Sequence, residues 1–538
     1  MLIPFIMEKA VSLHADREAV VCGKHRFTYR DFARRVYGLS GFLHAQGVGK
    51  GDCVAILHQN SHEFLEAYFA VAGLGAILNP LNTRLSPREL SSILDDSEAG
   101  TLLAASRFTD KVSALSELGT GIQRVIWTGE GQRSSPFQDF DYEEILSYNA
   151  EPPLTPEMDD DHVAQLYYTS GTTGVPKGVM LSHRNVCVHA LAAIAELQIT
   201  DRDRWIHAAP LFHLADAWAT FALTWVGGKH VIIPDFDPPE VIALMERERV
   251  TLTNMIPTML NMLTHTPGVQ DRDFSSLRVI LSGGSPIAPE VVRRIMDTFG
   301  CDYIQTYGMT ETSPYLTVSI LKESLTRLPN EEQFAYKART GRPFLGVLLK
   351  VVREDGTEVA HDDHEVGEII VQGDIVTKGY WKRPQETSKA LRNGWLHTGD
   401  MAVVDPEGYV NIVDRKKDMI ITGGENVYSV EVENVLYAHP AVLEAVVIGV
   451  PDPKWGEAVK AVVVLKDGFS AEEEEIIRHC KEQIASYKAP KSVDFVDALP
   501  RTGSGKLYKK GLKDRYEAQA ACLSQTQVPE PDDFDGAS

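Results

Sequence analysis

Apolar positions in the first 340 residues alternate between short continuous runs and stripes with helical spacing. The run Val54–Leu57 predicts a buried strand, and residues 60–75 follow with Phe64 and Tyr68 on one helical face. Strands that alternate with helices predict parallel sheets covered by helices on both faces. Further strands of this kind are predicted at residues 101–104, 125–127, 163–167, 231–233, 279–281 and 302–305.

Two helix starts can be predicted from local polar residues. In Ser86-Pro87-Arg88-Glu89, the serine can cap the helix, the proline suits its first turn, and Glu89 completes a capping box. Ser470 and Glu473 have the same spacing, which predicts a capped helix over residues 470–484.

The pattern changes after about residue 340. Apolar runs become shorter, β-rich and punctuated by turns, which favours a barrel-like subdomain. A charged run at 414–418 separates this region from a small α+β pattern. We therefore expect an α/β fold. Its parts are a large N-terminal domain (1–413) of stacked, mostly parallel sheets with a β-barrel-like subdomain, a hinge (414–418), a small mobile α+β domain (419–518) and a disordered acidic tail (519–538).

Composition limits the binding partners and the cellular compartment that can be expected. The chain has 538 residues and a net charge of −22, which argues against nucleic acid or an anionic membrane as the main partner. Its six cysteines include no C-x-x-C pair, so we expect no zinc site, reduced thiols and a cytoplasmic location. The apolar stretch 67–78 is too short to span a bilayer, and the first residues lack a signal-peptide pattern.

The stretch from Tyr168 to Val179 predicts a phosphate-binding loop. Its glycines free the backbone to approach an oxyanion closely, and Lys177 adds a positive charge. The order differs from the Walker loop, since Lys177 is followed by glycine and Pro176 precedes it. The residues expected to hold a polyphosphate are Thr169, Ser170, Gly171, Thr172, Thr173, Gly174 and Lys177.

Five further segments stand in a fixed order along the chain. They are Pro210–Trp218, Gly283-Gly284-Ser285-Pro286, Tyr307-Gly308-Met309-Thr310-Glu311-Thr312, Gly394–Asp400 and Pro500–Lys506. Together with the phosphate loop they resemble the acyl-adenylate-forming enzymes, which include acyl-CoA synthetases, firefly luciferase and peptide-synthetase adenylation domains. The resemblance extends from about residue 10 to residue 516.

The resemblance implies roles for the nucleotide-binding residues. Thr310 would touch a nucleotide phosphate, and Glu311 would hold Mg²⁺, an ion that prefers hard oxygen ligands. Asp400 and Arg415 would contact the ribose. The turn Gly283, Gly284 and Ser285, with Tyr307 and Gly308, would lie against the adenine and the acyl group.

Other roles concern the acyl group and the second half-reaction. His213, Trp218 and Pro314 would line the acyl pocket, although plain packing explains His213 and Trp218 equally well. Lys506 would stabilise charge on the α-phosphate during adenylation. Lys417 would be the pivot of a rotation that brings Gly423, Gly424 and Glu425 to the thiol. We expect the nearby Lys509, Lys510 and Lys513 to be solvated.

The implied reaction uses ATP, Mg²⁺ and coenzyme A. A carboxylic acid is adenylated with release of pyrophosphate, and coenzyme A then displaces AMP; a homodimer is one allowed assembly. The apolar pocket segment favours a short- or medium-chain fatty acid or a thioether acid, as in medium-chain and methylmercaptopropionate CoA ligases. Three alternatives remain open: an adenylation enzyme that loads a carrier protein, for which Asp216 could bind an amino group, a luciferase-like oxygenase, and a non-enzymatic scaffold.

Overall fold

The computed structural model describes residues 1–131, 133, 135–147, 156–169, 176–452, 454–501 and 507–525. The chain divides into two compact units. The first comprises residues 1–365, 369–398 and 404–411, and the second comprises 366–368, 399–403 and residues from 412 onward.

The first unit contains a nine-stranded sheet. Its central strands pair in parallel, whereas β14–β15, β15–β16 and β1–β2 pair antiparallel. In spatial order the strands are β16 (Arg342–Pro343), β15 (Tyr315–Val318), β14 (Asp302–Gly308), β13 (Val279–Gly283), β12 (Leu252–Asn254), β10 (Arg204–His207), β11 (Lys229–Ile232), β1 (Glu18–Cys22) and β2 (His25–Thr28).

A seven-stranded sheet lies in the same unit. All its pairs are parallel except the last, in which β8 and β9 are antiparallel. Strand β9 is not among the strands predicted from the sequence. The spatial order is β7 (Gln138–Asp141), β6 (Arg124–Thr128), β5 (Thr101–Ala105), β3 (Cys53–Leu57), β4 (Ile77–Pro80), β8 (Val163–Thr169) and β9 (Lys177–Ser182).

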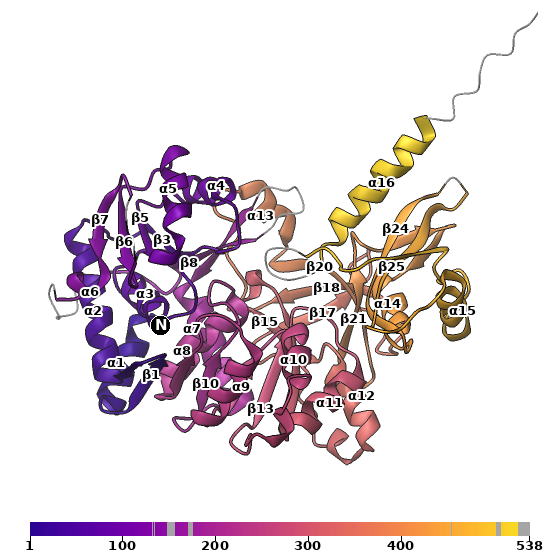
Figure 1. The fold of residues 1–538 in the computed structure, drawn as a ribbon, viewed down its shortest axis with the longest axis horizontal. Coiled ribbons are helices and arrows are strands. Elements are labelled where there is room, and N and C mark those ends of the chain that lie inside the picture. Colours follow the sequence, from indigo (N-terminus) through magenta and orange to yellow (C-terminus); the bar gives the residue numbers. More distant parts are fainter. Residues whose placement is uncertain are drawn as a thin grey trace, which may run out of the picture. The chain divides into compact units, whose positions relative to one another are not determined.

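Helices cover these sheets, as the alternating pattern predicted. Helices α4 and α5 lie beside β3, β5 and β6 (Figure 1), where Leu90, Ile93 and Leu115 join a buried apolar cluster. The capping box of Ser86 and Glu89 at the start of α4 is confirmed. The helices are α1 (Pro4–His14), α2 (Tyr29–Ala45), α3 (His62–Gly73), α4 (Pro87–Ser97), α5 (Thr109–Glu117), α6 (Tyr142–Ile145), α7 (His183–Leu197), α8 (Leu214–Val226), α9 (Pro238–Arg247), α10 (Pro257–Thr264), α11 (Pro289–Phe299), α12 (Asn330–Ala338) and α13 (Pro384–Ala390).

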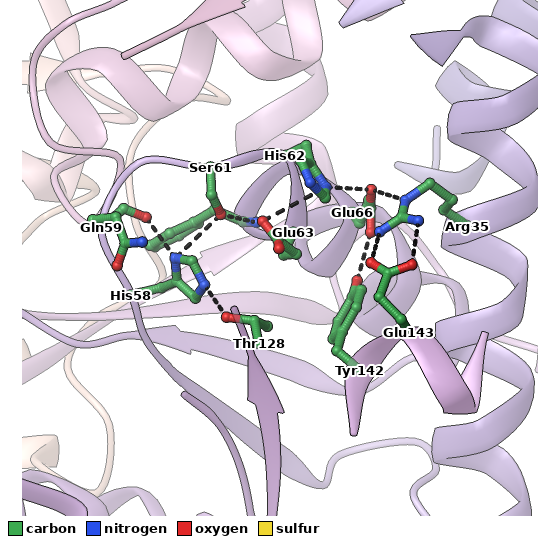
Figure 2. Close-up of polar contacts among 11 residues, drawn as sticks. Arg35, His58, Gln59, Ser61, His62, Glu63, Glu66, Thr128, Tyr142 and Glu143 are labelled. Carbon is green, nitrogen blue, oxygen red and sulfur yellow. Dashed lines mark hydrogen bonds and ion pairs between the residues drawn. The ribbon is translucent and has the colours of Figure 1, made fainter. Parts of the chain in front are cut away.

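A buried carboxylate ties three of these helices together (Figure 2). Glu66 of α3 has no exposed surface, and its oxygens accept hydrogen bonds from Arg35 Nε at 2.6 Å and from the Tyr142 hydroxyl at 2.6 Å. His62 Nδ1 lies 3.0 Å from the same carboxylate. Because Arg35 belongs to α2 and Tyr142 to α6, this cluster fixes the packing of α2, α3 and α6.

The β-rich region after residue 340 forms a five-stranded sheet, in agreement with the predicted change of pattern. The order is β17-β18-β20-β19, and β21 pairs with β20. The bounds are β17 (Leu348–Val352), β18 (Gly367–Gln372), β19 (Leu391–Arg392), β20 (Trp395–Val404) and β21 (Val410–Arg415).

The second unit has α+β character, with an apolar core between α14, α15 and the strands. The predicted cap at Ser470 is wrong. Helix α15 begins at Glu473, its N-cap is Glu472, and the Glu473 carboxylate accepts the backbone N–H of Val493 instead. The elements are β22 (Ile420–Thr422), β23 (Glu425–Val427), α14 (Ser429–Tyr437), β24 (Val442–Asp452), β25 (Gly456–Leu465), α15 (Glu473–Gln483), β26 (Ser492–Phe495) and α16 (Lys509–Gln525).

Helix α16 continues to Gln525, so the first residues of the predicted acidic tail are helical. Residues 526–538 lie outside the described part of the chain. Within the described ranges, no helix is both long and apolar enough to cross a membrane.

Candidate active site

The strands on either side of the predicted phosphate loop are antiparallel neighbours. Thr169 at the end of β8 pairs with Lys177 at the start of β9, so the chain reverses direction between them. A Walker loop instead connects a strand to a helix, which explains why the order of residues differs. Ser170, Gly171, Thr172, Thr173 and Gly174 lie outside the described residues.

Glu311, the predicted metal ligand, lies in a short helical turn (Thr310–Thr312) after β14 and is only 7% exposed. The hydroxyl of Tyr380 donates a hydrogen bond to Glu311 Oε1 at 2.9 Å. Burial, followed by the negative charge of Glu311, raises the pKa of Tyr380 well above its ordinary value. The phenol therefore stays protonated and acts as the donor.

Tyr380 also contacts the predicted phosphate-binding lysine. The Nζ atom of Lys177 lies 5.4 Å from the centroid of the Tyr380 ring, within the range of a cation–π interaction. Lys177 belongs to the seven-stranded sheet and Glu311 follows a strand of the nine-stranded sheet, so one tyrosine connects site residues from both sheets. Tyr380 is not among the residues predicted from the sequence, where its only signal is an aromatic residue in Lys378-Gly379-Tyr380-Trp381.

The segment that carries Tyr380 runs along β9 like an additional short strand. Val179 forms an antiparallel bridge with Tyr380, and the N–H of Trp381 donates to the Gly178 carbonyl at 2.7 Å. The N–H of Met180 donates to the Gly379 carbonyl at 3.1 Å. We call residues 377–383 the β9 strap.

Asp96 at the end of α4 anchors the far end of the β9 strap. Its backbone carbonyl accepts Trp381 Nε1 at 3.1 Å, and its Oδ1 accepts Arg383 at 2.8 Å. The Tyr168 hydroxyl of β8 donates to the other carboxylate oxygen at 2.7 Å. One aspartate thus links the strap to the strand that enters the phosphate loop.

The predicted glycine turn lies at the end of β13, beside β14. Gly283 pairs with Thr306, and a Cβ atom on Gly283 would lie 2.5 Å from Thr306 Oγ1, so only glycine allows this approach. Gly284 has a φ of +87°, which favours glycine. The Ser285 carbonyl accepts Gln305 Nε2 at 2.9 Å.

The segment from Tyr307 to Pro314 lies immediately beside this turn. A Cβ atom on Gly308 would lie 1.8 Å from the Pro314 carbonyl oxygen, so a side chain at this position is excluded. The same oxygen accepts Met309 N–H at 3.0 Å and Thr312 Oγ1 at 2.6 Å. The carboxyl ends of the parallel strands β13 and β14 thereby bring Gly283–Ser285 near Tyr307–Glu311, at the sheet edge where α/β folds usually bind ligands.

The predicted acyl-pocket residues lie at and after the start of α8. His213 is the N-cap residue, half-buried, with its ring centroid 4.6 Å from that of Phe212. Trp218 is only 2% exposed, and its Nε1 donates to the Tyr315 hydroxyl at 3.0 Å. His189 and Phe344 complete an aromatic cluster around Tyr315, next to Pro314.

Asp216, the candidate amino-group ligand of the carrier-loading alternative, lies in the first turn of α8 and is completely buried. Its Oδ1 accepts Trp205 Nε1 at 2.9 Å, and its Oδ2 lies 2.7 Å from His207 Nδ1. His207 Nε2 in turn lies 3.0 Å from His230 Nδ1. Both carboxylate oxygens are therefore used by internal partners.

The two predicted ribose-binding residues come together within the second unit. Arg415 Nε lies 3.4 Å from Asp400 Oδ1, with the aspartate side chain 12% exposed and the arginine side chain 54% exposed. A carboxylate that is fixed by an arginine can accept hydrogen bonds from a diol. Lys417, the predicted pivot, is exposed in a turn at residues 416–418.

Gly423 and Gly424 form the two-residue turn between β22 and β23, and Glu425 is the first residue of β23. Their φ values of +60° and +86° are those of a type I′ hairpin turn. A Cβ atom on Gly423 would lie 2.9 Å from the Trp455 ring.

Lys506 lies outside the described residues. The prediction that neighbouring lysines are solvated is wrong for Lys509, whose Nζ lies 2.8 Å from Glu433. Lys513 also has an ion-pair partner, Glu457 at 2.8 Å from its Nζ, but its side chain is 36% exposed and so still partly solvated. Both partners are distant in sequence, so no local pattern could identify them.

The donor set suits a magnesium ion that arrives with a nucleotide. Throughout the described ranges, no three or more His, Cys, Asp or Glu side chains gather in a way that could hold a metal alone. Glu311 offers one buried carboxylate with a fixed oxygen. Mg²⁺ is commonly held by one or two carboxylates together with substrate phosphates, so these residues fit it.

Known proteins resemble this chain over nearly its whole length. A feruloyl-CoA synthase from Amycolatopsis sp is 40% identical over 499 residues, covering 93% of this chain and 96% of the relative. A long-chain-fatty-acid–CoA ligase from Thermus thermophilus is 38% identical over 522 residues, covering 95% of each. The ATP-bound structure of MatB from Rhodopseudomonas palustris superimposes with a TM-score of 0.85 at 30% identity, covering 96% of this chain and 99% of that one. The model of the AMP-binding enzyme family matches residues 7–381, and that of the AMP-binding enzyme C-terminal domain matches 431–506. This chain therefore belongs to the AMP-binding enzyme family.

Proposed function

We propose that this ATP-dependent acyl-CoA ligase activates a small or medium-chain carboxylic acid. A carboxylate oxygen attacks the α-phosphorus of ATP and pyrophosphate leaves; the coenzyme A thiol then attacks the acyl carbon and AMP leaves. The observation that carries the proposal is the grouping of Lys177, Tyr380 and Glu311, which places a cation and a metal-type carboxylate at one point of the first unit.

Within the first unit, we assign the nucleotide phosphates to Thr169, Lys177, Thr310 and the hydroxyls of the loop between β8 and β9. Bound Mg²⁺ would neutralise phosphate charge, held by Glu311. Lys177 would add a fixed positive charge beside the same phosphates. Positioning and charge screening are the main contributions that a protein makes to phosphoryl and adenylyl transfer.

The acyl group is assigned to the start of α8 and the adjoining segment at Pro314. Trp218 would supply an aromatic wall, and His213 at the helix N-cap would lie nearest the reacting carboxylate. The aromatic surroundings favour a substrate with an apolar body. The preference for medium-chain or thioether acids belongs to this proposal, whereas the two curated relatives described above are named for feruloyl and long-chain fatty acyl groups.

Within the second unit, we propose that Asp400 and Arg415 hold the ribose hydroxyls and that Lys506 stabilises charge on the α-phosphate. A rotation at residues 414–418, with Lys417 as its pivot, would then withdraw Lys506 and present Gly423, Gly424 and Glu425 to the thiol. Such an exchange lets one site serve two half-reactions.

The carrier-loading alternative is not favoured. An adenylation enzyme for amino acids needs a carboxylate that faces the substrate amino group, whereas Asp216 is completely buried and hydrogen-bonded to Trp205 and His207.

A cytoplasmic location and a homodimer remain proposals. The thiols of Cys22, Cys53, Cys187, Cys301 and Cys480 are buried and free, which is compatible with a reducing compartment. Light scattering of the purified protein would decide the assembly.

The test is pyrophosphate release across a panel of carboxylic acids of increasing length, including thioether and aromatic acids. Each acid is assayed with and without coenzyme A. We expect magnesium-dependent pyrophosphate release with small or medium-chain apolar acids and the corresponding acyl-CoA product when the thiol is present. Release with amino acids alone, followed by transfer to a carrier protein, would overturn the proposal.

A further inference from the structure

Two site residues that are far apart in sequence share one neighbour. Glu311 accepts a hydrogen bond from the Tyr380 hydroxyl at 2.9 Å, and the Lys177 ammonium lies 5.4 Å from the centroid of the same ring. The phenol thus contacts a negative group through its hydroxyl and a positive group through its π-face. No other function of Tyr380 is implied by the sequence motifs.

We infer that Tyr380 is a positioning residue that holds the side chains of Glu311 and Lys177 in the relative positions needed to bind the metal-bound triphosphate. The inference rests on the proposed function, since it takes Glu311 as the metal ligand and Lys177 as the phosphate cation. The hydroxyl fixes the orientation of the carboxylate, and the ring limits the directions in which the lysine can point.

The surroundings of Tyr380 are rigid enough for this role. Its backbone forms a bridge with Val179 of β9, and its N–H donates to Thr387 Oγ1 at 2.9 Å. The N–H of the next residue, Trp381, donates to the Gly178 carbonyl at 2.7 Å. The backbone of Glu311 is tied to the same segment, because its carbonyl accepts the Thr377 N–H at 2.7 Å.

Groups that hydrogen-bond to a metal ligand commonly change metal affinity when they are removed. Loss of such a partner weakens binding by about 10- to 100-fold, since the ligand then loses its fixed orientation. The phenol at Glu311 has this relation to the carboxylate. Removal of the Tyr380 hydroxyl should therefore weaken metal binding while leaving the nucleotide-binding residues themselves in place.

The chain offers a matched control elsewhere in the first unit. The Tyr142 hydroxyl donates to the buried carboxylate of Glu66 at 2.6 Å (Figure 2), so Tyr142→Phe removes the same kind of bond as Tyr380→Phe. The Glu66 cluster contains Arg35, His62 and Tyr142 and shares no residue with the Glu311 grouping. A general effect of deleting a buried phenol hydroxyl would affect both variants.

The experiment measures Mn²⁺ binding to the full-length protein in the presence of ATP and without an acid substrate, by electron paramagnetic resonance. We expect Tyr380→Phe to weaken Mn²⁺ binding by about 10-fold or more and Tyr142→Phe to bind as the unmodified protein does. Equal affinities for the two variants would overturn the inference. Thermal unfolding of both variants is the control that each variant is folded.

Two further variants separate the steps of the inference. Glu311→Gln should weaken Mn²⁺ binding; if it does not, the proposed metal role of Glu311 fails. If Glu311→Gln weakens binding and Tyr380→Phe does not, the positioning role alone fails. Tyr380→Leu removes the ring as well, so it should weaken metal-free ATP binding in EDTA by about two- to fivefold relative to Tyr380→Phe. An equal affinity for ATP would exclude support of Lys177 by the ring.

Discussion

Asp216 Oδ2 lies 2.7 Å from His207 Nδ1, and neither side chain has exposed surface. This pair joins α8, which carries the predicted acyl-pocket residues, to strand β10. The carboxylate also accepts the indole N–H of Trp205. A buried group with these partners serves the packing of α8 against β10 rather than direct contact with a substrate.

We therefore predict that Asp216→Ala lowers the free energy of unfolding by about 3–5 kcal/mol, because it leaves two buried polar partners unpaired. Urea denaturation measures the change. The control is Asp201→Ala, whose carboxylate is 42% exposed and pairs with Arg17 at the surface, and which should cost no more than about 1 kcal/mol. Equal losses for the two variants would show that the buried carboxylate of Asp216 contributes no more to stability than the exposed carboxylate of Asp201.

The second prediction concerns the pH dependence of stability. Burial lowers the pKa of His189 from 6.5 to about 3, so the folded protein holds this ring neutral at pH values where the unfolded chain protonates it. The stability from this group is present above pH 6.5 and is lost as the pH falls toward 3, at about 1.4 kcal/mol per pH unit.

His189→Gln removes this titration and keeps an acceptor for the Tyr315 N–H, which donates to His189 Nε2 at 3.3 Å. Chemical denaturation between pH 4 and pH 6.5 should give a shallower slope of unfolding free energy for this variant. A slope equal to that of the unmodified protein would mean that His189 is protonated in the folded state.

The third prediction separates the two half-reactions. If Lys506 has the proposed role, Lys506→Ala should slow adenylation by about 10²–10³-fold, because one donor to charge that develops in the transition state is lost. Thioester formation from supplied acyl-adenylate should be nearly unchanged. Pyrophosphate release measures the first step and acyl-CoA formation the second. A similar loss in both steps would exclude the exchange of residues between half-reactions.

The fourth prediction compares the two glycines of the β22–β23 turn. Both have positive φ, so alanine at either position adds backbone strain of about 1–2 kcal/mol. Gly424 has open space for a Cβ atom, whereas alanine at Gly423 must displace the Trp455 ring, which would be 2.9 Å away.

If this turn lines the path of the thiol, Gly423→Ala should slow thioester formation more than Gly424→Ala does. The difference would be about 10-fold for a displacement that costs about 1.4 kcal/mol in that step. Adenylation rates serve as the internal control and should be similar for both variants. A larger effect of Gly424→Ala would contradict the role of Trp455.

Local signals predicted much of the fold because their causes are local. The capping box at Ser86 and Glu89 involves residues three positions apart, and the structure confirms it. The similar pattern at Ser470 and Glu473 failed because a distant N–H, that of Val493, uses the Glu473 carboxylate. Strand β9 was missed since its pairing partner lies across the phosphate loop.

The same limit applies to the candidate site. Sequence motifs indicated Glu311 and Lys177, but nothing in a linear pattern shows that both meet Tyr380, which lies 69 residues after the glutamate. Asp216 illustrates the opposite case. Its position beside His213 suggested a ligand for an amino group, and only the contacts with Trp205 and His207 reveal its structural use.

The β9 strap also determines how this region can be modified. Residues 377–383 are held to β9 and to Asp96, so the neighbour of β9 on this side comes from a segment about 200 positions further along the chain. A loop grafted from a relative would consequently have to bring its own strap to keep the interstrand register. A truncated first unit that ends before residue 377 would leave this side of β9 without its partner.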